Sequence, residues 1–180
     1  MKRRFLTAAA VLVLVTVPLF ATTAVEMSDQ SLAQESQQIL IGECTDLRSE
    51  WVDRVLVTRA TIRVSEWLKG SGPAEVVVTL PGGADANRAV PVAMSYPGAP
   101  ELRVGENAFL FLVTDDAYGS IINGFSQGKY SIVEYEGEQL ISRDLTNIRL
   151  SSGPGVVRGG TTTRKKLNDF KAEVRGYLGN

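Results

Sequence analysis

Apolar and polar residues alternate along much of residues 39–150, as they do in β-strands. The clearest run is Thr58-Arg59-Ala60-Thr61-Ile62-Arg63-Val64. A period of two with one apolar face indicates a half-buried strand. About seven predicted strands follow one another along the chain: 39–44, 58–64, 75–80, 107–114, 120–125, 129–135 and 139–143. Residues 66–70 are expected to form a turn, and residues 81–106 a long loop.

This spacing of short strands predicts a mainly β protein rather than βαβ units. We expect residues 39–150 to fold as a small OB-like antiparallel β-barrel or sandwich. Residues 107–114 are apolar on both faces and are predicted to form a central strand.

The period changes near the C-terminus. Residues 151–162 are rich in glycine and serine and are expected to form a linker. Over residues 163–179 one apolar stripe at helical spacing predicts an amphipathic helix: Leu167, Phe170, Val174, Tyr177 and Leu178. Thr163 is its predicted N-cap, and the basic residues 164–166 oppose the helix dipole. Because so short a helix is unstable alone, we expect it to pack on the barrel. A partner-binding or membrane-surface helix is the alternative.

The N-terminus has the features of a secretory signal peptide. Lys2, Arg3 and Arg4 precede an apolar run, and small residues follow up to Ala24. We expect residues 1–24 to be removed after Sec-type export, leaving residues 25–38 as a disordered lead-in and no stable membrane span. The predicted location is extracytoplasmic, periplasmic or secreted. The alternatives are twin-arginine export and an uncleaved membrane anchor.

Composition excludes several kinds of site. The sequence has no histidine and one cysteine, which excludes a Ser-His-Asp triad, His-ligated zinc and an intrachain disulfide. We therefore expect no metal and no cofactor. Cys44 is predicted to be a buried core residue. The 19 basic and 20 acidic residues give a net charge of −1, and signal removal takes away three positive charges, which disfavours nucleic-acid binding.

Several short motifs resemble a group of uncharacterised exported bacterial proteins. The motifs are Glu-x-Leu-Lys-Gly at 66–70, Pro-Gly-Gly at 81–83, and Gly-Glu at 105–106 leading into Leu-Phe-Leu at 110–112. The resemblance covers residues 39–178, and the layout is loosely similar to netrin and metalloprotease-inhibitor OB-type barrels. Those inhibitors begin with a metal-chelating cysteine and carry several disulfides, unlike this chain. The resemblance therefore implies a fold and a compartment, but no activity.

One strand face is the candidate ligand site. Arg59, Thr61 and Arg63 share it, and Trp67 is expected nearby, with Trp51 and Tyr130 as further aromatic candidates. Arginines and aromatic rings are common binding anchors. The expected partner is an unknown protein or glycan of the cell envelope, and not a nucleic acid.

Two clusters of acidic residues could in principle bind a cation or act in catalysis. Glu134, Glu136 and Glu138 could gather a cation, but a solvated hairpin tip is the favoured interpretation. Asp115 and Asp116 could form an acid–base pair, but an Asp-rich turn explains them fully.

The sequence thus predicts an exported non-catalytic binding or envelope-associated module. A protease inhibitor-like protein that uses the 81–106 loop is the first alternative. A carboxylate-based hydrolase is the second.

Overall fold

The computed structural model describes residues 23–179, and strands predominate in them. The strands are β1 (Thr23–Val25), β2 (Gln38–Val52), β3 (Val55–Lys69), β4 (Glu75–Pro81), β5 (Gly83–Asp85), β6 (Val92–Met94), β7 (Asn107–Asp115), β8 (Gly119–Ile122), β9 (Lys129–Tyr135), β10 (Glu138–Asp144), β11 (Arg149–Gly153), β12 (Val156–Gly159) and β13 (Thr162–Lys166). The helices are α1 (Asp29–Glu35), the 3-10 helix η1 (Phe125–Gly128) and α2 (Leu167–Leu178). The protein is mainly β with a C-terminal helix, as the sequence predicts.

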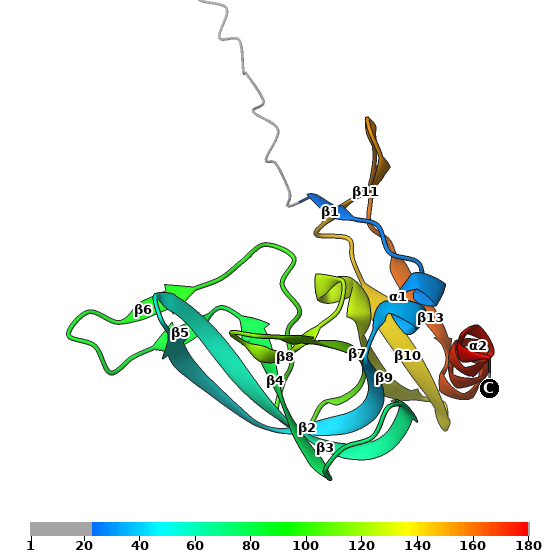
Figure 1. Cartoon of the computed structure of the whole chain (residues 1–180), viewed down its shortest axis with the longest axis horizontal. Helices are drawn as coiled ribbons and strands as arrows, with labels where there is room; N and C mark the ends of the chain where they lie inside the picture. The colour runs from blue at the N-terminus through cyan, green and yellow to red at the C-terminus, as the bar shows by residue number, and fades with distance from the viewer. Residues whose placement is uncertain (1–22, 180) are drawn as a thin grey trace, which may run out of the picture.

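Eight strands form one large sheet in the order β13-β10-β9-β7-β2-β3-β4-β8. The strand β7 pairs with β8 as well as with β2 and β9, so the pairings of β2, β3, β4, β8 and β7 return to their start. Within this circuit β4 and β8 are parallel and the other neighbours antiparallel. Figure 1 shows these five strands together, with α1 and α2 on the side of β10 and β13.

One apolar core draws on all five strands of the circuit, and a second core packs on the other face of the sheet. The first, called the inner core, contains Leu40, Cys44, Ala60, Ile62, Val78, Leu80, Leu102, Ala108, Leu110, Leu112 and Ile122. The second joins α1 and α2 to the other face of the sheet, with Phe109, Phe111, Tyr130 and Phe170 at its centre. Consecutive residues of β2 enter different cores: Ile39 and Ile41 the outer one, Leu40 the inner one.

The hairpin of β2 and β3 is longer than the sequence pattern predicts. Both strands have 15 residues, and residues 66–70, expected to form a turn, continue β3 as far as Lys69. Three register shifts interrupt the pairing and leave Thr45, Ser65 and Leu68 as extra residues. Each such β-bulge reverses the alternation of side chains along its strand. At these positions the sequence therefore stops alternating between apolar and polar residues, although the strand continues.

The N-terminal segment differs from its prediction. Residues 25–38, expected to be disordered, contain the end of β1 and the helix α1. Leu32 and Ala33 of α1 are fully buried in the outer core, and Ser28 caps the helix by accepting a hydrogen bond from the Ser31 amide. Seven residues are too few to show helical periodicity, so tertiary burial decides the structure here. The predicted signal peptide, apart from residues 23 and 24, lies outside the described residues.

The C-terminal boundaries also change. The predicted linker at 151–162 contains the end of β11, all of β12 and the first residue of β13. The helix begins at Leu167 rather than at 163, and its N-cap Lys166 makes no side-chain cap hydrogen bond. Arg164, Lys165 and Lys166 belong to β13, which pairs with the edge of β10. The three cations therefore lie before the helix, outside its first turn.

The closing helix packs on the sheet through its apolar stripe. The Phe170 ring is fully buried, with its centroid 5.0 Å from that of Phe109 and 4.7 Å from that of Tyr130. Aromatic pairs at such separations add to the stability that burial supplies. Neither α1 nor α2 is long and apolar enough to cross a membrane, and this holds for every helix between residues 23 and 179.

Candidate functional site

Arg59, Thr61 and Arg63 lie on the outer face of the circuit, because they alternate with Ala60 and Ile62 of the inner core. The Arg59 side chain is only 26% exposed. Its Nε donates to Glu50 Oε1 at 2.6 Å, and its Nη1 donates to Thr79 Oγ1 at 2.5 Å and to the Tyr118 carbonyl at 2.7 Å. Arg59 therefore ties β2, β4 and the β7–β8 turn together.

Arg63 and Thr61 are free of such constraints. The Arg63 side chain is 60% exposed and pairs with Glu43 at 3.5 Å. Exposed pairs of this kind contribute little stability. Thr61 is half-buried, and its carbonyl accepts from Thr45 Oγ1 at 3.3 Å. A binding partner could therefore reach this part of the face.

The aromatic residues expected beside these side chains lie elsewhere. The bulge at Ser65 reverses the alternation of β3, so Trp67 packs against the inner core and not on the face of Arg63. Tyr130 is fully buried in the outer core. Trp51 is held at the far end of the hairpin by Asp85, whose Oδ2 accepts from Nε1 at 2.7 Å. The face therefore lacks the predicted aromatic platform.

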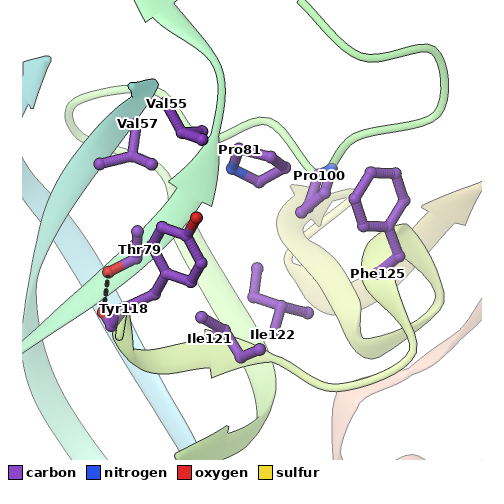
Figure 2. Close-up of a pocket in the computed structure, with 9 residues that line it drawn as sticks. All are labelled: Val55, Val57, Thr79, Pro81, Pro100, Tyr118, Ile121, Ile122 and Phe125. Atoms are coloured by element: carbon purple, nitrogen blue, oxygen red, sulfur yellow. Dashed lines mark hydrogen bonds between the residues drawn. The ribbon is translucent and has the colours of Figure 1, made fainter. Parts of the chain in front are cut away.

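An apolar pocket of about 240 Å³ lies where Arg59 meets the β7–β8 turn. Its walls come from five parts of the chain: β3, β4, β8 with the preceding turn, η1, and the segment before β7. Figure 2 shows the residues that line it: Val55, Val57, Thr79, Pro81, Pro100, Tyr118, Ile121, Ile122 and Phe125. Seven of these nine side chains are hydrocarbon. The pocket is suited to an apolar group.

Hydrogen bonds hold the pocket in shape. Thr79, which is 4% exposed, donates from Oγ1 to the Tyr118 carbonyl at 2.6 Å (Figure 2). Asp115 Oδ1 accepts from the amides of Ala117 and Tyr118, both at 2.9 Å. The carboxylate of Asp115 thus fixes the turn, as an Asp-rich turn predicts.

The glutamate cluster forms a hairpin tip. Glu136 and Gly137 have positive φ values of 52° and 77°, and they connect β9 with β10. Glu138 pairs with Lys166 at 2.7 Å, with both side chains more than half exposed. Over residues 23–179, no three His, Cys, Asp or Glu side chains lie close enough together to hold a metal ion.

The loop of the inhibitor alternative, residues 81–106, is anchored at a few buried residues and exposed over much of its length. Pro100 and Leu102 are buried, and β5 pairs with β6. Figure 1 shows that this small hairpin and its connection project from the body of the protein. Val90, in that connection, is 74% exposed. The exposed part of the loop could enter a partner's cleft.

The pocket itself is absent from the sequence prediction, since it joins residues 70 positions apart. One local signal was available: Pro81 and Pro100 both belong to the predicted long loop. No protein-family model matches this sequence, and no curated protein matches it.

Proposed function

We propose that the chain is an exported, non-catalytic binding module built on an OB-type β-barrel. The barrel consists of β2, β3, β4, β8 and β7. The closed circuit of pairings supports it, together with an inner core to which all five strands contribute. OB-type barrels bind ligands on their outer face, beside the loop between the first and second strands and the loop between the fourth and fifth strands. In this chain the corresponding β2–β3 and β7–β8 turns flank the pocket.

The apolar pocket carries the proposal. Its lining has no carboxylate, amine or thiol, and its polar groups are the hydroxyls of Thr79 and Tyr118. Hydrocarbon walls favour an apolar side chain over the hydroxyls of a sugar. We therefore propose that a protein of the cell envelope inserts an apolar side chain into the pocket. Arg63 and Thr61 lie on the same face of the sheet, where this partner could contact them.

Panning a random peptide library against the folded chain tests this function. We expect enriched peptides to share an apolar anchor residue. Val55→Glu places a carboxylate in the pocket and should weaken their binding at least about tenfold, since an unpaired buried charge is costly. Val90→Glu, at an equally apolar but exposed position outside the pocket, is the matched control and should bind normally.

Other results would contradict the proposal. Peptides sensitive to Val90→Glu but not to Val55→Glu would assign binding to the 81–106 loop, as in the inhibitor alternative. Peptides that bind both variants equally would show that the pocket is not the binding site. A glycan-array ligand lost in Val55→Glu would make the partner a glycan.

Export has its own test. Strand β1 already pairs with β11 from Thr23 onward, and Gln127 holds the segment after it, because its amide donates to the Val25 carbonyl at 2.8 Å and accepts from the Met27 amide at 2.8 Å. We expect the mature N-terminus at Val25 or within a few residues of it, which intact-mass analysis of protein recovered outside the cytoplasm would detect. A full-length mass in the membrane fraction would indicate a retained anchor instead.

A further inference from the structure

The peptide bond at the predicted signal-cleavage site lies within the fold. Removal of residues 1–24 requires hydrolysis of the Ala24–Val25 bond, and this bond belongs to β1. Strand β1 runs parallel to β11, with Ala24 opposite Leu150 and Val25 opposite Ser151, and Figure 1 shows the two strands side by side. Ala24 also packs on the small apolar cluster that contains Leu150. The Val25 side chain is 76% exposed, so any protection of the bond must come from the backbone.

Both edges of the backbone next to this bond are occupied. In the peptide group that follows it, the Glu26 amide donates to the Ser151 carbonyl at 2.9 Å. The Val25 carbonyl of the same group accepts from Gln127 Nε2 at 2.8 Å. Because the carbonyl and the amide of a trans peptide group point in opposite directions, these two hydrogen bonds lie on opposite edges of the chain. Gln127 Oε1 also accepts from the Met27 amide at 2.8 Å, so this side chain pairs with β1 as a neighbouring strand would.

The side chain of Gln127 is itself fixed in place. The residue lies in η1 and is only 2% exposed. Its Nε2 also donates to the Gly124 carbonyl at 3.3 Å, and its backbone carbonyl accepts from Arg143 Nη1 at 2.7 Å. Opening of β1 takes the Met27 amide away from Oε1, and the loss of a partner is unfavourable for a buried polar atom. These contacts therefore oppose local opening of β1.

The chain that follows the bond is anchored within a few residues. Helix α1 begins at Asp29, four residues after Val25. The carboxylate of Asp29 accepts a hydrogen bond from the Tyr130 hydroxyl and pairs with Arg143 at 3.2 Å. Leu32 of the same helix is fully buried in the outer core. A protease would therefore find little free chain on this side of the bond.

We infer that β11 and Gln127 protect the Ala24–Val25 bond once the chain has folded, so that residues 1–24 are removed only before β1 docks. The inference rests on the proposed export. Cleavage adds water across the amide bond, leaves a carboxylate on Ala24 and frees the amine of Val25. A protease that binds this segment needs its backbone edges free. In the folded chain, cleavage is limited to the fraction of molecules in which β1 is open.

The inference links processing to the route of export. A chain exported unfolded presents the Ala24–Val25 bond before β1 can pair with β11, and it loses residues 1–24. A chain exported already folded, as in the twin-arginine alternative, carries the bond in its protected state and keeps these residues.

The order of addition in a cell-free synthesis tests the inference. Detergent-solubilised signal peptidase is present while the full chain is made, or it is added after the chain has folded. We expect the first arrangement to give chains that begin at Val25, and the second to be cleaved at least about tenfold more slowly, as measured by intact mass. Equal rates in the two arrangements would overturn the inference and leave export intact. Resistance in both would overturn the inference together with the proposed removal of residues 1–24.

Variants of the folded chain test the role of Gln127. Gln127→Ala removes the contacts to Val25 and Met27, so the folded variant should be cleaved several-fold faster than the folded wild type. Gln34→Ala, at an exposed glutamine of α1, is the matched control and should be cleaved as slowly as the wild type. A natively folded Gln127→Ala that is as resistant as the wild type would overturn the inference.

Val78→Ala separates local opening of β1 from global unfolding. Val78 is fully buried in the inner core, so this variant lowers the global stability without changing a contact of β1. We expect it to resist cleavage as the wild type does. If it is cleaved as fast as Gln127→Ala, the whole fold and not the contacts of β1 protects the bond, and the inference is overturned.

Discussion

Cys44 is fully buried in the inner core, and its Sγ lies 3.7 Å from the Asp46 carbonyl oxygen, to which it donates. Burial raises the pKa of the thiol, so little thiolate is present at neutral pH. We expect a thiol reagent to modify the native protein orders of magnitude more slowly than the protein in denaturant. With one cysteine in the sequence, the labelling rate reports this site alone. Fast native labelling or a disulfide-linked dimer would show an accessible thiol.

Glu173 predicts how stability depends on pH. Burial alone would raise its pKa, but hydrogen bonds from Lys165 at 2.8 Å and Tyr177 at 2.6 Å outweigh it and lower the pKa below 4.5. A lowered pKa in the folded state stabilises the fold fully above the unfolded value, and this stabilisation is lost as the pH falls through the folded value.

In Glu173→Gln this contribution is missing at every pH. At pH 7 the variant should therefore have a lower urea midpoint than the wild type, and the difference should shrink as the pH falls below about 4.5. Urea titrations between pH 7 and pH 3 measure it. A difference that stays constant over this range would mean that the carboxylate charge is irrelevant.

At the scale of the elements, α2 packs on the sheet with Phe170 as its largest buried side chain. Phe170 is fully buried between Phe109 and Tyr130, so Phe170→Ala should leave a cavity and lower the free energy of unfolding by about 3–5 kcal/mol. Asn168→Ala, on the exposed side of the same helix, should change it by less than about 0.5 kcal/mol. Equal urea midpoints for the two variants would mean that the helix contributes no packing.

Strands with an uninterrupted local pattern were predictable. β9 has the predicted bounds, and β7 extends its predicted range by one residue. The alternation also assigns Arg59 to the outer face. Trp67 was not predictable, because one extra residue in β3 reverses the face of everything that follows it. Nor was α1, since two buried residues in a polar segment give no periodic signal.

At the scale of the whole molecule, the candidate site could not be predicted. Val55, Thr79, Pro100, Tyr118 and Phe125 come together only because the strand pairings return to β7. The same pairings bring Arg59 into hydrogen bonds with Glu50, Thr79 and the Tyr118 carbonyl, and leave Arg63 exposed. The local hydrophobic pattern does not show such contacts between distant residues. Predictions made from the composition and from the N-terminal features do not depend on these contacts.

The alternation of Ile39, Leu40 and Ile41 between the two cores has a consequence for unfolding. Strand β2 cannot detach from one core without leaving the other, so the two cores should melt as one cooperative unit. Far-ultraviolet circular dichroism and tryptophan fluorescence should give coincident transitions. In hydrogen exchange, Phe170→Ala should speed global opening and thus lower the protection of amides in β3 and β4, far from the substituted helix. Loss of protection confined to α2 and β13 would instead define two independently unfolding halves.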